Sequence, residues 1–173
     1  MNHTTRYLLD TSVLIEANKT YYAFDLVPTF WKHLLVQSRA GTVSSIDKVK
    51  AEVSLRNKEL TYWANNSFEQ WESTTVESTT NKYQQIMEWA AAQKQYTQSA
   101  KDEFAEAKRA DAWIIAHAFA NKYAIVTEEK FNGDIKKRIP IPNVCKVFDI
   151  KYVDTFQMLR DLGINLGTCF GSK

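Results

Sequence analysis

The sequence is poor in the residues that mark several classes of protein. Two cysteines among 173 residues are too few for the disulfide framework of a small secreted domain. Five glycines and three prolines exclude collagen-like and linker-dominated chains. No apolar run approaches the roughly 20 residues that span a bilayer, and the polar N-terminus leads into no secretory signal. We therefore expect a soluble, cytoplasmic protein without a membrane partner.

An excess of charge of either sign is also missing. Lys and Arg total 22 against 20 Asp and Glu, so the formal net charge is +2. This balance excludes a polybasic nucleic-acid tail and an acidic disordered chain. Hydrophobic residues make up 45% of the chain, enough for one continuous core at this length. We expect residues 1–173 to form a single domain.

Short apolar segments alternate with longer segments of helical periodicity. The expected strands cover residues 6–10, 42–46, 124–127 and 146–150. The expected helices begin at 11 or 12 and at 28, and cover 47–56, 60–71, 82–95, 99–122 and 153–162, with a loop over 73–80. Asp47 and Ser99 are the expected N-caps of their helices. This alternation predicts an α/β fold around a mainly parallel sheet.

Sites in parallel sheets lie outside the carboxyl ends of the strands. Asp10 follows the first expected strand, and Glu129 lies two residues beyond the strand that ends in Thr127. Either acid alone could be a helix cap, but two acids at one edge of a sheet indicate a site.

Two further acids lie on expected helices. Asp111 falls within an apolar stripe of the 99–122 helix, where an isolated carboxylate is costly to desolvate. It needs a cation, a set of donors or a cavity, or an intrahelical salt bridge to Lys108. Glu52, between Val49 and Val53, would alone be an ordinary solvated glutamate, but the topology could bring it to the same crevice.

We refer to these carboxylates as the four acids: Asp10, Glu52, Asp111 and Glu129. If they converge, they repel one another unless a hard divalent cation binds, and Mg²⁺ and Mn²⁺ prefer oxygen ligands. Such a cation polarises phosphate oxygens and lowers the pKa of bound water. The pattern therefore predicts a Mg²⁺ or Mn²⁺ site suited to phosphoryl chemistry.

Four motifs resemble those of the PIN-domain nucleases. They are Tyr-Leu-Leu-Asp-Thr-Ser-Val-Leu-Ile (7–15), Val-Lys-Ala-Glu (49–52), Ala-Asp-Ala-Trp-Ile-Ile-Ala-His-Ala (110–118) and Ile-Val-Thr-Glu-Glu-Lys-Phe (125–131). Each is weak alone, but their order and spacing match up to about residue 160. The resemblance implies a three-layer α/β/α sandwich and metal-dependent cleavage of single-stranded RNA. Many bacterial and archaeal members are VapC-like toxins that a co-expressed antitoxin neutralises.

The resemblance carries over to individual positions. Asp10, Glu52 and Asp111 match the most characteristic acids of the family. Glu129 stands where the family usually has Asp in a Thr-x-Asp motif, so its direct ligation of the metal is left open.

Other residues near these motifs are expected to support the site. Glu128 or Asp134 could share the role of Glu129, and Ser12 and Thr127 match small polar positions that orient the acids or bound water. The segment 24–31 is not typical of the best-known toxins and indicates a less characterised prokaryotic branch.

Basic and aromatic residues are the expected RNA contacts. A basic cluster follows the last of the four acids: Lys130, Lys136, Lys137 and Arg138. These side chains could hold phosphates, although a solvated loop explains any one of them equally well. Further cations could do the same, namely Lys101, Lys108 and Arg109. Five aromatic residues could stack on unpaired bases but are more often core residues: Trp63, Phe68, Trp71, Trp89 and Trp113.

The sequence thus predicts a Mg²⁺- or Mn²⁺-dependent endoribonuclease that leaves 5′-phosphate and 3′-hydroxyl ends. We expect it to be the toxin of a toxin–antitoxin pair and a homodimer. A non-catalytic PIN-like module that binds RNA or protein remains open. A haloacid-dehalogenase-type phosphatase with Asp10 as nucleophile is a weaker alternative, because Ser12 stands where that family has a second Asp. The histidines and cysteines show no zinc-site spacing.

Overall fold

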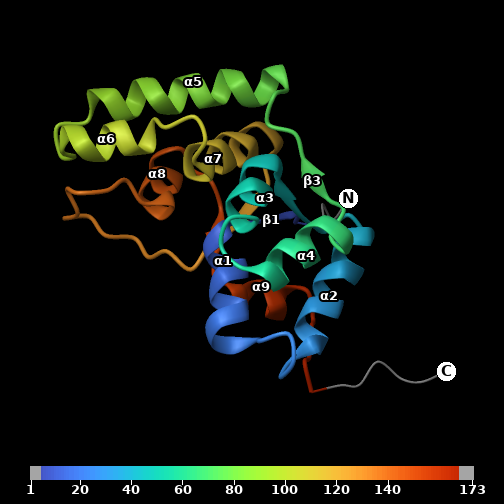
Figure 1. The fold of residues 1–173 in the computed structure, drawn as a ribbon. Helices are drawn as coiled ribbons and strands as arrows, with labels where there is room; N and C mark the ends of the chain where they lie inside the picture. The colour runs from blue at the N-terminus through green and yellow to red at the C-terminus, as the bar shows by residue number, and fades with distance from the viewer. Residues whose placement is uncertain (1–4, 168–173) are drawn as a thin grey trace.

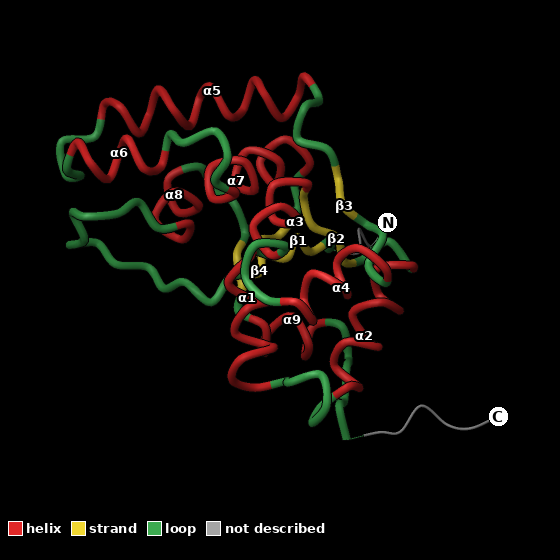
Figure 2. Tube along the Cα trace, viewed as in Figure 1, coloured by secondary structure: helices red, strands yellow, loops and turns green. Residues whose placement is uncertain are grey.

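The computed structural model describes residues 5–167, and its central feature is one five-stranded sheet (Figures 1 and 2). All neighbouring strands are parallel, in the order β3-β2-β1-β4-β5. The strands are β1 (Tyr7–Leu9), β2 (Val43–Ile46), β3 (Trp71–Glu72), β4 (Ala124–Val126) and β5 (Tyr152–Val153). Strands β1, β2 and β4 are fully buried, as expected for a parallel sheet covered on both faces. The α/β prediction is confirmed.

Helices cover both faces of the sheet and make a three-layer α/β/α sandwich (Figure 1). One side carries α3 (Asp47–Val53), α5 (Glu77–Ala92), α6 (Gln98–Phe104), α7 (Ala110–Asn121) and α8 (Ile141–Val147). The other side carries α2 (Pro28–Arg39) and α9 (Thr155–Asp161). Helix α1 (Thr11–Glu16) continues from β1 into a π-helical turn at Ala17–Tyr21, and α4 (Lys58–Asn66) follows α3.

A buried histidine ties α5 and β3 to α7. His117 Nδ1 lies 2.9 Å from Thr79 Oγ1 on α5, and its Nε2 lies 2.8 Å from a Glu72 carboxylate oxygen on β3. Both ring nitrogens are therefore used, which fixes the outer helix layer on the sheet. No helix in the described part of the chain is both long and apolar enough to cross a membrane.

The single helix expected over 99–122 is wrong. The chain forms α6 and α7, separated by a turn over residues 105–109. Thr97, rather than Ser99, caps α6 by accepting from the Ala100 N–H. The sequence did not reveal this break, because residues 105–108 have high helix propensity. The N-terminus of α7 is instead held by Glu52, whose carboxylate accepts from the Ala110 N–H.

The strand expected over 146–150 is also wrong. Residues 141–147 form α8, with Pro142 in its first turn, where proline is tolerated. The strand lies further along, at Tyr152–Val153. Periodicity alone does not separate a short buried helix from a strand, and here the prolines begin the helix.

Three smaller expectations are corrected. The helix expected over 60–71 is α4, which covers only Lys58–Asn66, and Trp71 belongs to β3. The 73–80 loop is shorter than expected, since α5 begins at Glu77. Asp47 is not an N-cap: it lies in the first turn of α3, where its carboxylate accepts from the Thr74 hydroxyl at 2.8 Å.

Candidate functional site

Asp10 follows the central strand β1 and is the most buried of the four acids, with 3% of its surface exposed. Its Oδ2 accepts from Ser12 Oγ at 2.6 Å and from Thr127 Oγ1 at 3.0 Å. Its Oδ1 is buried and has no hydrogen-bond partner among residues 5–167. Burial, then the charges of Asp111 and Glu129, raise the pKa of Asp10 to about 7, against the effect of the hydroxyl donors.

Asp111 lies in the first turn of α7, not in the middle of a long apolar stripe as expected. Its carboxylate accepts from the Arg109 guanidinium at 3.4 Å. Burial and then the charge of Glu129 raise the pKa of Asp111 to about 6, although Arg109 opposes the rise. The alternative partner Lys108 is exposed, and Arg109 makes the ion pair instead.

Glu52 uses both carboxylate oxygens to hold other elements. Oε2 accepts from Thr11 Oγ1 at 2.6 Å, and Oε1 accepts from the Ala110 N–H at 2.9 Å. It therefore joins the starts of α1 and α7 to α3. Its negative charge at the N-terminus of α7 also suits the helix dipole. Glu52 is therefore not an ordinary solvated glutamate, because each of its carboxylate oxygens accepts a hydrogen bond from another element.

Glu129 follows β4 and faces the α8 side of the site. One carboxylate oxygen accepts from the Ile141 N–H at 2.8 Å, and the other pairs with Arg138. Its N–H donates to Thr127 Oγ1 at 3.2 Å, so Thr127 connects Glu129 to Asp10.

The remaining predicted supporting residues divide into two groups. Ser12 Oγ donates to Asp10 and accepts from the Glu128 N–H at 3.1 Å, so it lies within the site. The Glu128 carboxylate accepts from the Thr155 N–H and hydroxyl at the start of α9. Asp134 is exposed, and no hydrogen bond or ion pair in the described part of the chain joins it to the four acids.

The four acids share one region: Thr127 connects Asp10 with Glu129, and Glu52 bonds the N–H of Ala110, the residue before Asp111. The raised pKa values of Asp10 and Asp111 reflect this grouping. However, within residues 5–167 no group of three or more His, Cys, Asp or Glu side chains is arranged to hold a metal ion. A divalent cation fits the charge of the region and would give the buried Asp10 Oδ1 a partner. In the arrangement shown, Arg109 and Arg138 neutralise Asp111 and Glu129 instead.

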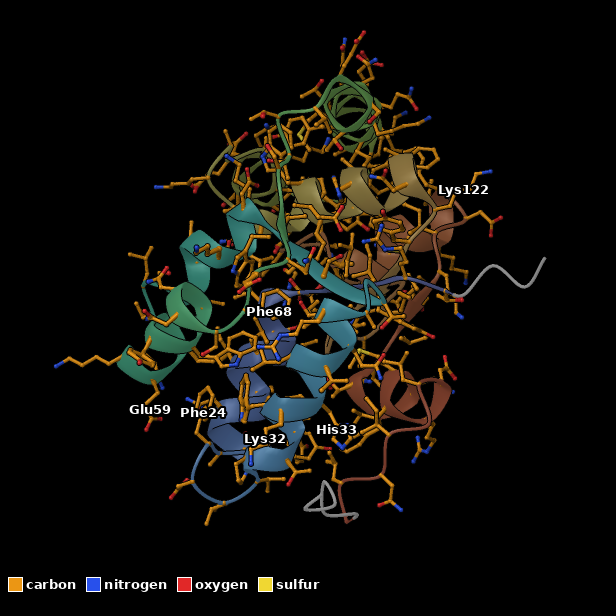
Figure 3. The ribbon with its side chains drawn as sticks, turned by 90° about the vertical axis from the view of Figure 1, so that its right-hand side faces the viewer. Phe24, Lys32, His33, Glu59, Phe68 and Lys122 are labelled. Carbon is orange, nitrogen blue, oxygen red and sulfur yellow. The ribbon has the colours of Figure 1, made fainter. Side chains whose placement is uncertain are left out.

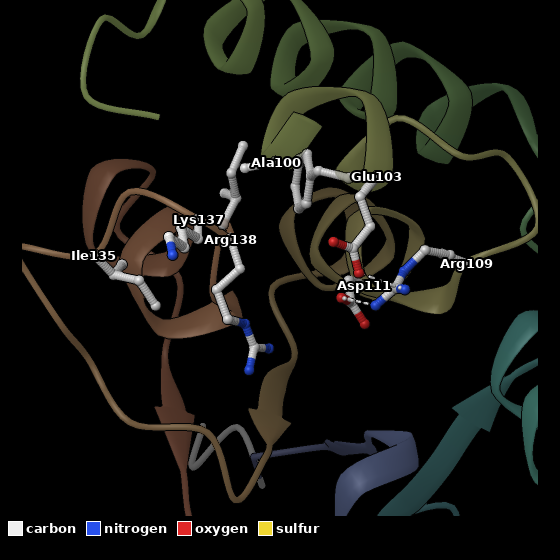
Figure 4. Close-up of a pocket in the computed structure, with 9 residues that line it drawn as sticks. Ala100, Glu103, Arg109, Asp111, Ile135, Lys137 and Arg138 are labelled. Atoms are coloured by element: carbon white, nitrogen blue, oxygen red, sulfur yellow. Dashed lines mark hydrogen bonds and ion pairs between the residues drawn. The ribbon is translucent and has the colours of Figure 1, made fainter. Parts of the chain in front are cut away.

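A cavity of about 400 Å³ lies beside Asp111 (Figure 4). Of the predicted RNA-binding residues, Lys137 and Arg138 line it. Lys136 is exposed but is not part of this lining, and Lys130 reaches Asp154 at 3.6 Å. Arg109 also lines the cavity; its ion pairs depend on the break between α6 and α7, which sequence periodicity did not reveal.

The aromatic residues considered for base stacking are mainly core residues. Trp63 and Phe68 are buried, while Trp113 stacks on Tyr83 with ring centroids 3.8 Å apart. Trp71 and Trp89 are partly buried against the core. Among residues 5–167, the exposed aromatic residues are instead Tyr21, Tyr62, Phe131 and Phe156.

The unusual segment 24–31 packs between elements. Phe24 stacks on Trp31 with ring centroids 4.0 Å apart, and Trp31 meets Trp63 of α4 at 5.1 Å. Figure 3 shows Phe24 and Phe68 on the side of the molecule formed by α2 and α4. The segment therefore helps to attach α4 to α2. His3 and Cys169 lie outside the described residues.

These observations define an α/β protein with an acidic region at the carboxyl edge of a parallel sheet. The chain belongs to the family described as domain of unknown function DUF4411, whose sequence model matches residues 7–166. Searches of curated proteins and of solved structures gave no match. The family description assigns no activity, so the resemblance to PIN nucleases stays a prediction.

Proposed function

We propose that the protein is a Mg²⁺- or Mn²⁺-dependent endoribonuclease acting on single-stranded RNA. The observation that carries the proposal is the state of Asp10: a buried carboxylate with one oxygen unpartnered and a pKa raised by Asp111 and Glu129. Perturbed carboxylates grouped in a cleft are typical of functional sites. The motif resemblance to PIN nucleases supplies the reaction class.

Each acid has a distinct part in this proposal. Asp10 and Asp111 would hold the cation, with Glu129 and Glu52 completing the site directly or through water. When bound, the cation would supply Lewis-acid stabilisation of the phosphate and a more acidic water. Ser12 and Thr127 fix the Asp10 carboxylate through its Oδ2, which leaves Oδ1 free for a ligand.

The arginines beside the acids serve the substrate in this proposal. Arg109 and Arg138 are the counterions of Asp111 and Glu129 in the arrangement shown. A cation on the acids would take over that neutralisation and leave both guanidiniums to contact the RNA, with Arg138 on a phosphate. Arginine suits this role, because its planar fork matches phosphate oxygens.

The biological setting follows from the same resemblance. We place the protein in the cytoplasm as the toxin of a toxin–antitoxin pair, acting as a homodimer and inhibited by a protein antitoxin. Co-purification of the product of an adjacent small reading frame, with loss of ribonuclease activity in the complex, is the expected result.

The direct test is cleavage of an unstructured RNA with Mn²⁺ or Mg²⁺ by the wild type and by Asp10→Asn and Asp111→Asn. Both variants should lose at least 100-fold in rate while circular dichroism shows an unchanged fold, and EDTA should abolish wild-type activity. Asp134→Asn is the matched control, because this acid is exposed and outside the site. Undiminished cleavage in both site variants would contradict the proposal.

The alternatives give different results in the same assays. A binding module would bind RNA in EDTA, and its wild type would show no turnover with metal. A phosphatase would form an aspartyl-phosphate on Asp10, which acid quenching with a labelled phosphate ester would trap.

A further inference from the structure

The cavity beside Asp111 has two walls from different parts of the chain (Figure 4). Glu103 of α6, Arg109 and Asp111 form one wall. Lys137 and Arg138, from the loop between β4 and α8, form the other. Its volume of about 400 Å³ lies within the range of small-ligand pockets.

The chemistry of the lining is mixed in a way that suits a nucleotide. The apolar part consists of Ala100, Phe104, Ile135 and Ile139. Three cationic side chains stand around it, and Arg138 reaches into the open space between the walls (Figure 4). A flat ring against the apolar surface, with its phosphate on the cations, would use both parts. An acidic peptide would use only the cations.

The ion pair between Glu103 and Arg109 places an acceptor next to a donor. Arg109 Nη1 lies 2.7 Å from Glu103 Oε1, and the Glu103 side chain is 48% exposed. A carboxylate accepts several hydrogen bonds, so Glu103 retains acceptor capacity. Arg109 uses Nη1 for Glu103 and Nη2 for Asp111, and each of these nitrogens carries a second N–H, so this guanidinium also has donors to spare.

Guanine matches this pair best among the four bases. Its Watson–Crick edge carries one acceptor, O6, followed by two adjacent donors, N1–H and N2–H₂. The donors would meet the Glu103 carboxylate and O6 would meet Arg109. Only an unpaired base exposes this edge, and proteins commonly read single-stranded RNA in this way.

We infer that the cavity binds one unpaired nucleotide of the RNA substrate, with guanosine preferred, beside the phosphodiester to be cut. The inference rests on the proposed ribonuclease function for its substrate class. Glu103 would set the base preference, whereas Lys137 would bind the backbone regardless of the base.

Binding without cleavage tests the inference separately from the function. The probes are fluorescein-labelled RNA pentanucleotides of uridine with A, C, G or U at the centre, titrated into the Asp10→Asn protein in EDTA and followed by anisotropy. The G-centred probe should bind at least fivefold tighter than all-uridine RNA, since a bidentate base contact is worth about 1–3 kcal/mol. Glu103→Gln should reduce this preference below twofold. Lys137→Ala should weaken all four probes alike.

Two exposed residues provide matched controls. Asp102→Asn, also on α6, and Lys32→Ala, on α2, change charges outside the cavity lining and should leave affinity and preference unchanged. The inference is overturned if no probe binds, if Glu103→Gln keeps the preference, or if Lys137→Ala matches its control. Displacement of RNA by a polyglutamate peptide without any base preference would also overturn it and identify a peptide site.

Failure of the proposed function has a separate signature. If guanosine preference depends on Glu103 but the wild type cuts no RNA with metal, the cavity is a nucleotide site in a protein without nuclease activity. If RNA is cut with no preference for guanosine next to the cleaved bond, the function stands and the inference fails.

Discussion

The burial of Asp10 predicts how the stability of the metal-free protein depends on pH. Its pKa in the folded state is about 7, above its ordinary value of 3.8. A raised carboxyl pKa means that its stabilising contribution is fully present below pH 3.8 and is lost as pH rises through about 7. The pKa of Asp111, raised to about 6, acts in the same direction. In EDTA the protein should therefore become less stable between about pH 4 and pH 7.

The size of the effect follows from the rise in pKa. From 3.8 to about 7, at about 1.4 kcal/mol per pKa unit, ionising Asp10 destabilises the fold by up to about 4 kcal/mol. Asp10→Asn removes this charge, and its amide oxygen can still accept from Ser12 and Thr127. The amide nitrogen would then stand at the unpartnered Oδ1 position, at a cost of about 1–3 kcal/mol. The net gain at pH 8 should be about 1–3 kcal/mol.

Urea unfolding followed by tryptophan fluorescence, from pH 4.5 to 8.5 in EDTA, measures this directly. Asp10→Asn should be more stable than the wild type at pH 8 and no more stable at pH 4.5. Asp134→Asn, which removes an exposed acid, should follow the wild-type curve. A wild-type stability that is flat or rises with pH over this range would refute the reasoning, as would an Asp10→Asn protein less stable than the wild type at pH 8.

Three further predictions concern the metal and two buried contacts. Mn²⁺ at 100 times its dissociation constant should stabilise the wild type by about 2.7 kcal/mol in urea titrations. Mn²⁺ should bind more tightly at pH 8 than at pH 6, because the cation competes with protons for the carboxylates. Equal Mn²⁺ affinity at both pH values would argue against carboxylate ligands. Glu52→Gln should lower the unfolding free energy by about 1–3 kcal/mol, since an amide cannot accept from both Thr11 and Ala110; an unchanged urea midpoint would show that these bonds add no stability. His117→Ala should lower the unfolding free energy by about 3 kcal/mol or more, because the buried imidazole is lost and its partners Thr79 and Glu72 lose a hydrogen bond each. A melting temperature within about 2 °C of the wild type would contradict this.

The sequence was sufficient to predict the sheet edge that carries the site. Strands β1, β2 and β4 are short buried runs, and Asp10 and Glu129 follow two of them, so parallel pairing alone brings both acids together. Asp111 also lies in the acidic region, as predicted, but the reason given for it was wrong. Asp111 was expected inside the apolar stripe of one helix over 99–122, whereas it lies in the first turn of α7, which begins at Ala110.

What the sequence could not show were contacts made across large separations. The start of α7 depends on Glu52, which is 58 residues away from the N–H that it accepts. The ion pair of Glu129 with Arg138 depends on the path of the loop before α8. Neither leaves a periodic signal, so both the helix break and the counterions of the acids came only from the structure.

The central position of β1 has a consequence for the growing chain. This strand is synthesised first, but its neighbour β4 begins at Ala124, and Thr127 contacts Asp10 across 117 residues. Closing so long a loop is a slow, non-local step. Until β4 has been made and has paired with β1, the acidic region cannot assemble. The proposed ribonuclease site would therefore stay incomplete on the ribosome while the chain before β4 is being synthesised.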